Sequence, residues 1–370
     1  MKVVIFTCNT GGGHNAAARA IAEELEVRGI DHRVENALSF APMGEEEIIV
    51  GGHALAYKYA PKVYEAGYKY AEEHSSYPMY LNSAKYAPAM MRYLESGGYD
   101  TVISVHLSPA HAMTAIRKLW APNIKQYFVA TDYTCSPGVD QVEADRIFIP
   151  RGLSREFLLA GVDKAALLET GIPVRRACYE PLTCDYAREQ LYGELPLAPA
   201  DKVVLVGPGC LSAAEVGRLA KAVGADVEAV KLLVLCGKGN DNMKRQLRRL
   251  EDPRVKVLGY TTHMDLWMKA ADLLITKPGG LTSTEAVSCG VPAILLDVAP
   301  GLETHNRDFY VNRGCASSVV GLPALYAESV RLLTDRDARE RMRTNQRANF
   351  SAISVGELVD EVVRQDAARK

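Results

Sequence analysis

The sequence lacks any segment long enough to cross a membrane, because no run of about 18 apolar residues occurs in it. It also lacks an excess of either charge. Its 43 basic side chains are matched by 45 acidic ones, and the net charge of −2 gives no reason to expect nucleic acid as a partner. The eight cysteines form no C-x-x-C pair. This argues against a disulfide framework or a zinc site of that type and favours a reducing cytoplasm.

The N-terminus has no cleavage site of a secretion signal, since the apolar stretch 1–7 continues directly into the glycine-rich stretch 8–13. We therefore interpret residues 1–7 as a first strand. Hydrophobic residues make up 48% of the chain and charged residues 24%, which is typical of a soluble globular protein. A length of 370 residues predicts two domains of ordinary size.

Short apolar runs alternate with helical patterns along the whole chain, which predicts an α/β fold with parallel sheets and right-handed crossovers. The predicted strands are 3–7, 101–105, 127–131 and 146–149 in the first half, and 203–206, 232–235, 255–258, 273–276 and 293–296 in the second. Proline-rich stretches at 170–174 and 195–199 mark the boundary. We predict domains at 1–175 and 176–350, with a helix at 355–370 that returns to the first domain. Two such sheets would form a ligand cleft between their strand ends.

The stretch 276–306 is the most informative part of the sequence. A strand runs into the turn Lys277-Pro278-Gly279-Gly280, and Thr282 is predicted to open a helix with Glu285 in its first turn. A second strand, 292–296, leads to a second Pro-Gly loop and a helix from Asn306. Helix N-termini present unpaired backbone N–H groups, so two of them at one sheet edge predict an anion site, such as a nucleotide diphosphate pocket.

Glu285 allows two interpretations. With Thr282 it matches a capping box, and as a free carboxylate it can accept hydrogen bonds from both hydroxyls of a ribose. Lys277 is either a solvated strand-end lysine or a cation that neutralises a diphosphate. The loop 207–212, with Gly209 and Ser212, repeats the strand–glycine–helix theme and is a second place where phosphate can approach the backbone.

The first loop carries Gly11-Gly12-Gly13-His14 without the G-x-G-x-x-G spacing of dehydrogenases, so that kind of dinucleotide site is a poor fit. His14 is predicted at a helix N-terminus, where it is either a general base, a neutral hydrogen-bond donor, or a capping or core histidine. Asp132 and His106 each follow a strand on the same side of the sheet. For both, a contact with substrate and a turn-forming role remain open.

Residues 57–93 hold nine of the 18 tyrosines, together with five basic and three acidic residues. Tyrosine and lysine together are typical of the lipid headgroup zone. The alternative is an ordinary pair of helices whose tyrosines pack inward.

Taken together, these motifs resemble the diacylglycerol glycosyltransferase family. It includes the plant monogalactosyldiacylglycerol synthases and the bacterial processive glucosyltransferases, and it is related to the enzyme that adds N-acetylglucosamine to lipid-linked muropeptide. The resemblance covers nearly the whole chain. It is carried by 11–15 with Ala17-Ala18, 131–133, 169–175, 257–260, 276–282 with Glu285-Ala286, 290–292, and Pro300-Gly301 with Glu303 and Asn306.

The resemblance implies a GT-B fold, two Rossmann-like doubly wound domains facing across a cleft. It implies an inverting hexosyltransferase that moves sugar from a UDP-sugar to a membrane lipid, 1,2-diacylglycerol, at the inner face of the membrane. The protein would be cytoplasmic and peripheral, with residues 57–93 on the membrane surface. No cofactor and no metal are expected, since the UDP-sugar is a co-substrate. His14 or Asp132 would be the base. Acceptor-binding residues would be Gly12, Gly13, His106 and Tyr133; donor-binding residues would be Gly209, Ser212, Tyr260, Lys277, Gly279, Gly280, Thr282, Glu285, Glu303 and Asn306.

Two departures from the family leave parts of this interpretation open. Leu302 stands where the family has a glutamine that contacts the donor sugar, so the sugar is open. The stretch 134–139 lacks the aromatic residues expected after the proline, so the acceptor is open too. The alternatives are a different acceptor, a UDP-sugar 2-epimerase, or a catalytically inactive UDP-sugar sensor, which Leu302 favours.

Overall fold

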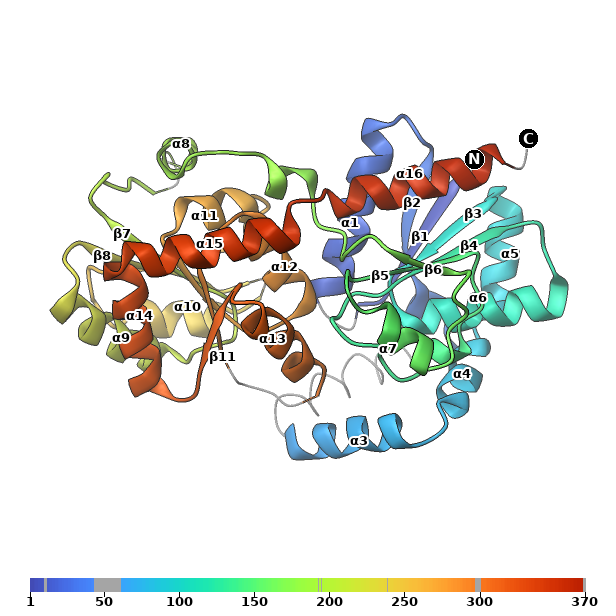
Figure 1. Ribbon diagram of the computed structural model, residues 1–370, viewed down its shortest axis with the longest axis horizontal. Coiled ribbons are helices and arrows are strands. Elements are labelled where there is room, and N and C mark those ends of the chain that lie inside the picture. The colour runs from blue at the N-terminus through green and yellow to red at the C-terminus, as the bar shows by residue number, and fades with distance from the viewer. Residues whose placement is uncertain are drawn as a thin grey trace. The chain divides into compact units, whose positions relative to one another are not determined.

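The computed structural model describes residues 1–9, 12–42, 61–191, 193, 195–237, 239–296 and 301–368, and for residues 61–65 it describes the backbone alone. The chain divides into two compact units (Figure 1). Unit 1 comprises Met1–Arg176, Ala299–Asn306 and Ile353–Lys370. Unit 2 comprises Ala177–Val298 and Arg307–Ala352.

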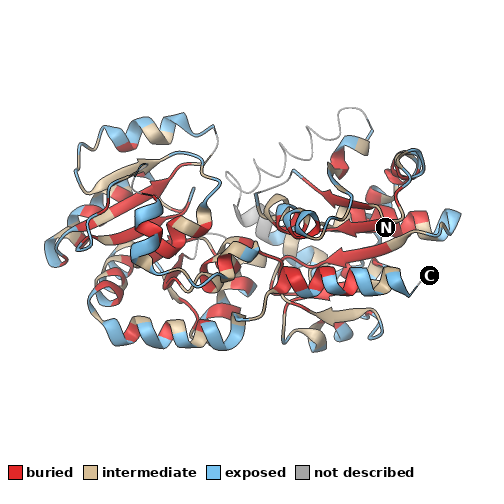
Figure 2. Ribbon diagram, turned by 90° about the horizontal axis from the view of Figure 1, so that it is seen from above, coloured by how far each residue is buried: buried red, intermediate tan, exposed pale blue. Residues whose placement is uncertain are grey.

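Unit 1 is built on a parallel six-stranded sheet formed by its described residues, in the order β2-β1-β3-β4-β5-β6. Its strands are β1 Val3–Thr7, β2 His32–Asn36, β3 Thr101–Ser104, β4 Lys125–Val129, β5 Arg146–Ile149 and β6 Leu167–Glu169. The inner strands are apolar and almost fully buried, as expected for strands covered on both faces. Figure 2 shows these strands in red, between helices whose outer faces are blue.

The helices of unit 1 bury side chains in its interior, with the exception of α3, none of whose described residues is buried. They are α1 Gly12–Val27, α3 Pro61–Glu73, α4 Tyr77–Ala84, α5 Ala87–Gly97, α6 Leu107–Trp120, α7 Ser154–Leu159 and α16 Ser354–Ala367, with short 3₁₀ turns η1 Ala37–Phe40 and η2 Val139–Gln141. One part of the core joins β1 to α5 and α6 through Phe6, Met90 and Ile116, all fully buried.

Unit 2 has a second parallel six-stranded sheet, again counted over the described residues, in the order β12-β11-β10-β7-β8-β9. Its strands are β7 Lys202–Val206, β8 Val230–Leu235, β9 Val255–Leu258, β10 Leu273–Thr276, β11 Ala293–Leu296 and β12 Ser317–Val319. Its helices are α8 Cys184–Gln190, α9 Ala213–Asp226, α10 Asp241–Arg248, α11 Met264–Ala270, α12 Gly280–Ser288, α14 Leu322–Thr334 and α15 Arg336–Phe350. Helix α13 Leu302–Asn312 belongs to unit 2 only from Arg307 onward, and the 3₁₀ turn η3 Arg176–Tyr179 only from Ala177.

The α/β fold predicted from the alternating pattern is confirmed, but three edge strands were not predicted. β2, β6 and β12 are short, and their side chains are only partly buried. A strand with one neighbour needs fewer apolar residues, so its sequence carries a weaker strand signal. β2 follows α1 closely and pairs with β1 from Val3↔His32 to Thr7↔Asn36, although the sequence showed no clear second strand there.

The last helix, α16, belongs to unit 1 although it follows all of unit 2 in the chain. It contacts α1, and Figure 1 shows the two helices next to each other. Arg28, directly after α1, forms an ion pair with Asp360, and Arg146 pairs with Glu361. Among the described residues, no helix has the length and apolar character needed to span a bilayer.

Candidate functional site

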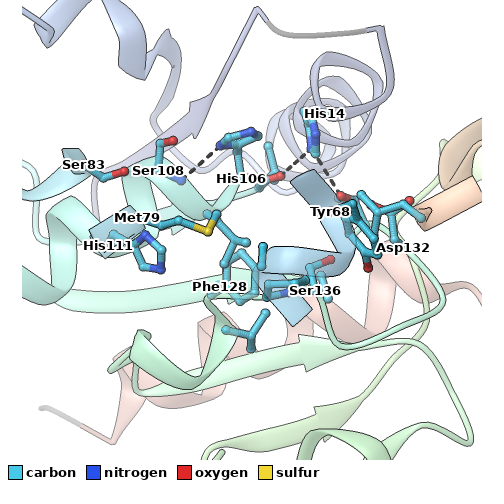
Figure 3. Close-up of a pocket in the computed structure, with 18 residues that line it drawn as sticks. His14, Tyr68, Met79, Ser83, His106, Ser108, His111, Phe128, Asp132 and Ser136 are labelled. Carbon is cyan, nitrogen blue, oxygen red and sulfur yellow. Dashed lines mark hydrogen bonds between the residues drawn. The ribbon is translucent and has the colours of Figure 1, made fainter. Parts of the chain in front are cut away.

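The strand order of unit 1 reverses direction next to β1, because β2 lies on one side of it and β3, β4 and β5 follow on the other. Ligands of open α/β sheets bind at the carboxyl ends of the strands at such a point. A cavity of about 270 Å³ lies there (Figure 3). It is lined by His14, Tyr68, Ala71, Met79, Ser83, Val105, His106, Leu107, Ser108, His111, Phe128, Ala130, Thr131, Asp132, Ser136, Pro137, Val139 and Leu302.

His14 lies in the first turn of α1, where the loop after β1 ends. Its Nδ1 is 2.9 Å from the carbonyl oxygen of Val105 and 3.2 Å from Thr131 Oγ1. Because a carbonyl can only accept, Nδ1 carries the proton in this contact. In the neutral imidazole the lone pair is therefore on Nε2. This geometry suits a base that acts through Nε2.

His106 lies beside His14, with ring centroids 4.7 Å apart and planes at 83°. Its Nδ1 accepts a hydrogen bond from the backbone N–H of Ser108 at 3.0 Å, so that His106 caps α6. The proton of a neutral His106 is therefore on Nε2, the reverse of His14. The turn-closing role left open for His106 is thus observed, and the same side chain also lines the cavity.

Asp132 follows β4 and is held by Asn306, whose Nδ2 donates to the carboxylate at 2.8 Å. The Oδ1 atom of Asn306 accepts from the backbone N–H of Tyr133 at 2.6 Å. Asn306 is fully buried, and both ends of its amide hold this turn. Its observed contacts are thus in unit 1, while the donor-binding role predicted for it stays a prediction.

The other predicted acceptor residues are placed unequally. Gly12 and Gly13 open α1 beside His14. Tyr133 is 4% exposed and does not line the cavity. Tyr68 and Leu302 do line it, and neither was predicted as a site residue. Tyr68 was one member of a tyrosine-rich stretch that we interpreted either as a membrane surface or as an ordinary pair of helices with inward-packed tyrosines, and neither interpretation singled it out as a cavity residue.

The tyrosines of this stretch differ in burial, which supports the inward-packing interpretation for some of them, while the membrane role stays a prediction. Tyr80 and Tyr86 are buried in the core of unit 1, whereas Tyr70 and Tyr77 are 63% and 51% exposed. Residues 57–60 and the side chain of Tyr64 lie outside the described part of the chain.

The strand order of unit 2 reverses between β7 and β10, and the loops that follow these two strands meet there. The backbone N–H of Gly207 donates to Ile275 at 2.8 Å. A Cβ on Gly207 would lie 2.5 Å from Thr276 Oγ1, so only glycine fits this close approach. Gly209 has φ +70°, and Lys277 Nζ lies 3.9 Å from where its Cβ would be. Lys277 is therefore beside the Gly207–Cys210 loop.

The capping box predicted for Thr282 and Glu285 is wrong. Helix α12 begins at Gly280 with Gly279 as its N-cap, so Thr282 lies inside the helix and Glu285 lies beyond its first turn. Gly279 is extended, with φ −72° and ψ 139°, and its missing side chain leaves the N-terminus of α12 uncovered. The ribose-binding role predicted for Glu285 stays a prediction. The helix predicted from Asn306 also begins earlier, at Leu302.

Three other predicted donor residues have distinct surroundings. Ser212 forms a true capping box with Glu215 at the start of α9, so its side chain already serves the helix. Tyr260 follows β9 and is 49% exposed. Glu303 lies with Asn306 in unit 1. Over the described residues, His, Cys, Asp and Glu side chains nowhere gather in a group of three that could hold a metal.

The fold and the two strand-end sites define a class of protein. The structure aligns with MurG of Acinetobacter baumannii at a TM-score of 0.63 and 17% identity, over 98% of this chain and all of that one. It also aligns with Anabaena HepE in complex with UDP-glucose at a TM-score of 0.58 and 14% identity, over 99% of this chain and 100% of that one. The fold is the GT-B fold of glycosyltransferases.

The family follows from sequence. Residues 14–174 match the family described as monogalactosyldiacylglycerol (MGDG) synthase, and residues 203–347 match the glycosyltransferase family 28 C-terminal domain. A processive diacylglycerol β-glucosyltransferase of Bacillus pumilus is 26% identical over 98% of this chain and 95% of its own length. The chain belongs to this family of diacylglycerol-type glycosyltransferases, as the motifs indicated.

Proposed function

We propose that the protein transfers a hexose from a UDP-sugar to 1,2-diacylglycerol with inversion at the anomeric carbon, and that the acceptor binds in the cavity of unit 1. The observation that carries this proposal is His14, whose Nδ1–H is bound by Val105 so that Nε2 is the basic atom on a largely apolar cavity. The relative named as a diacylglycerol glucosyltransferase and the UDP-glucose complex of a structure with the same fold support it.

In the proposed reaction His14 Nε2 removes the proton from the acceptor hydroxyl. The acceptor oxygen forms a bond to the anomeric carbon, and the bond from that carbon to the diphosphate oxygen breaks. UDP leaves with the bonding electrons, and His14 keeps the proton until it passes to solvent. Asp132 lies on the same cavity, where its carboxylate can accept a hydrogen bond from the acceptor.

The donor diphosphate is proposed to bind in unit 2 at the N-terminus of α12, whose N-cap Gly279 has no side chain to occupy the first backbone N–H groups. Lys277 is close enough to the Gly207–Cys210 loop to add positive charge there. These donors would stabilise the leaving diphosphate without a required metal or cofactor. Glu285 would accept hydrogen bonds from the ribose.

A peripheral position on the cytoplasmic face of the membrane is proposed from the surface of unit 1. Here α4 and the end of α6, which contact each other, expose large apolar side chains. These are Tyr77, Met79, Leu81, Leu119 and Trp120, exposed by 43% to 68%. Lys85 and Lys118 are exposed beside them. Apolar and aromatic side chains with lysines at their margin match the headgroup zone of an anionic bilayer.

The direct test is release of UDP from UDP-sugars in the presence of liposomes that contain diacylglycerol, with analysis of the lipid product. We expect a glycolipid to form, and UDP release to depend on diacylglycerol. UDP-sugar turnover that gives a free epimer without acceptor would instead identify an epimerase. Binding of UDP-sugar without any turnover would identify a sensor, and either result contradicts the proposal.

His14→Ala tests the proposed base, and we expect it to lower the turnover number by a factor of about 10² or more. His32→Ala is the matched control, because His32 Nδ1 also lies 2.9 Å from a backbone carbonyl, that of Ile30, but on the edge strand β2. Asp132→Asn distinguishes between His14 and Asp132 as the base that deprotonates the acceptor. If it abolishes turnover while His14→Ala retains most of it, Asp132 is the base.

Flotation with anionic liposomes tests the membrane surface. The double variant Leu81→Ser/Trp120→Ser is expected to weaken liposome binding. Leu159→Ser is the control, since Leu159 of α7 is 78% exposed but lies outside the proposed surface. Equal binding by the wild type and the Leu81/Trp120 double variant would contradict this part of the proposal.

A further inference from the structure

One polar atom on the cavity of unit 1 has no role in the reaction described above. Tyr68, on α3, lines the cavity together with Asp132 and His14 (Figure 3). Its Oη is closed off from solvent and lies near the carboxylate of Glu72, without a well-formed hydrogen bond to any of the described residues. Leaving a buried hydroxyl unsatisfied costs about 1–3 kcal/mol. Such a group on a cavity calls for an explanation, and a ligand that supplies the missing partner is one.

The Tyr68 ring is held in place by the segment that precedes α13. A Cβ on Gly301 would lie 3.5 Å from two carbons of the ring, so the backbone passes directly against it. The His305 ring is 6.5 Å away between centroids, and its Nε2 lies 3.5 Å from Glu72, one turn beyond Tyr68 on α3. The ring is therefore fixed on the cavity wall, so a ligand that fills the cavity meets the Tyr68 side chain in a fixed position, which is what a positioning contact requires.

The electrostatic surroundings keep this hydroxyl protonated. Burial, with the nearby carboxylates of Glu72 and Asp132, raises the pKa of Tyr68 well above its usual range. Tyr68 is thus a hydrogen-bond donor near Asp132, and an ionised carboxylate such as that of Asp132 can act only as an acceptor. An acceptor molecule beside Asp132 would meet a donor and an acceptor there, close to the apolar side chains of Leu107, Phe128 and Leu302.

We propose that Tyr68 is an acceptor-binding residue that donates a hydrogen bond to the ester carbonyl next to the reacting hydroxyl of a diacylglycerol. The inference rests on the proposed function and specifies how the acceptor is recognised. The reacting hydroxyl itself is a poor partner for Tyr68, because a bond donated to the attacking oxygen lowers its nucleophilicity. The neighbouring ester supplies a carbonyl oxygen that takes no part in the bond changes, so binding it orients the acceptor without a cost to reactivity.

The experiment compares Tyr68→Phe with the wild type, using diacylglycerol and a dialkylglycerol, whose ether links lack the carbonyl. With diacylglycerol, we expect Tyr68→Phe to raise the apparent KM for the acceptor about three- to tenfold, the range for one neutral hydrogen bond. The KM for the UDP-sugar should stay within the wild-type range, and the thermal midpoint of the ligand-free protein should not fall, because the variant loses only a buried hydroxyl. With dialkylglycerol, Tyr68→Phe and the wild type should have the same KM.

Tyr70→Phe is the matched control, because Tyr70 lies on the same helix, is 63% exposed and stacks on His74. It should behave as the wild type with both lipids. If the wild type glycosylates diacylglycerol and Tyr68→Phe has an unchanged acceptor KM, the role of Tyr68 is overturned and the proposed function stands. A rise in the donor KM alone also overturns it. If the wild type transfers sugar to neither lipid, the proposed function itself has failed.

Discussion

His14 and His106 show how backbone partners decide what a histidine can do. The two rings form a T-shaped pair on one cavity. Nevertheless, the Nδ1 of His14 contacts a carbonyl oxygen, whereas the Nδ1 of His106 accepts a hydrogen bond from a backbone N–H. Neutral His14 therefore presents a lone pair on Nε2, and neutral His106 presents an N–H there. The sequence predicted that both follow strand ends, but the proton positions depend on partners up to 91 residues away.

Asn306→Ala tests whether Asn306 positions Asp132 or binds the donor. It removes both hydrogen bonds to the 132–133 turn and leaves the Tyr133 N–H buried without its partner. We expect the free energy of unfolding to fall by about 1–3 kcal/mol, and turnover to fall while UDP affinity is unchanged. Denaturant unfolding measures the change in the free energy of unfolding, and calorimetry with UDP measures the affinity. Asn349→Ala, at an exposed asparagine of α15, is the control. A loss of UDP affinity would instead support the donor-binding prediction.

His111 predicts a pH dependence of stability. It is 1% exposed and donates through Nε2 to the Gly138 carbonyl at 2.8 Å. Burial lowers the pKa of His111 below its ordinary value of 6.5, although the Gly138 carbonyl and Asp140 oppose this shift. The unfolded chain therefore takes up a proton, as the pH falls below about 6.5, that the folded chain does not. The His111 contribution to stability is complete above that pH and is lost as the pH decreases.

We expect the free energy of unfolding of the wild type to decrease more than that of His111→Gln between about pH 7 and about pH 5.5. One proton accounts for a slope of at most about 1.4 kcal/mol per pH unit. Urea unfolding at both pH values measures the difference. His74→Gln, at an exposed histidine directly after α3, should keep the wild-type slope. Equal slopes for the wild type and His111→Gln would contradict the assignment.

At the scale of elements, glycine positions decide how closely two strands approach. Gly207→Ala would place a Cβ 2.5 Å from Thr276 Oγ1 and 3.0 Å from Thr276 Cβ, where β7 meets β10. We expect it to cost about 1–3 kcal/mol of stability and to weaken UDP binding by displacing the loop 207–212. The double variant Gly207→Ala/Thr276→Ala lacks Thr276 Oγ1, the atom nearest to the new Cβ, and should recover part of the lost stability and UDP affinity. Gly67→Ala, which meets open space, is the control. Fully additive effects in the double-mutant cycle would contradict a direct clash.

Helix α12 shows why a local motif was misinterpreted. Thr282-x-x-Glu285 has the residues of a capping box, and nothing within those four residues excludes it. Helical hydrogen bonding nevertheless begins earlier, since the Ser283 N–H donates to Gly279 at 3.1 Å. A glycine N-cap satisfies no backbone N–H with a side chain, so it leaves donors at the helix start for an anion. The corrected boundary thus strengthens the proposed phosphate site and leaves Glu285 without a capping role.

At the scale of the whole molecule, the stability of unit 1 depends on the end of the chain. The side chains of Val359 and Val363 lie on the same helix, α16, and are 0% and 36% exposed. We expect Val359→Ala to lower the free energy of unfolding by about 1.5–3 kcal/mol, through two lost methyl groups and the space they leave. Val363→Ala should change it by about 0.5 kcal/mol or less. Thermal and urea unfolding compare the two, and equal effects would show that α16 does not stabilise unit 1.

The sequence by itself determined the class of fold, the order of most strands and the family, because these depend on periodic burial and on short motifs that are read locally. It also indicated that His14, His106 and Asp132 follow strand ends, and the three line one cavity. Only the tertiary structure assigned Asn306 to the Asp132 turn, brought Tyr68 and Leu302 to the cavity, and joined α16 to unit 1. These relations join residues far apart in the chain, and no local pattern specifies which buried polar group meets which partner.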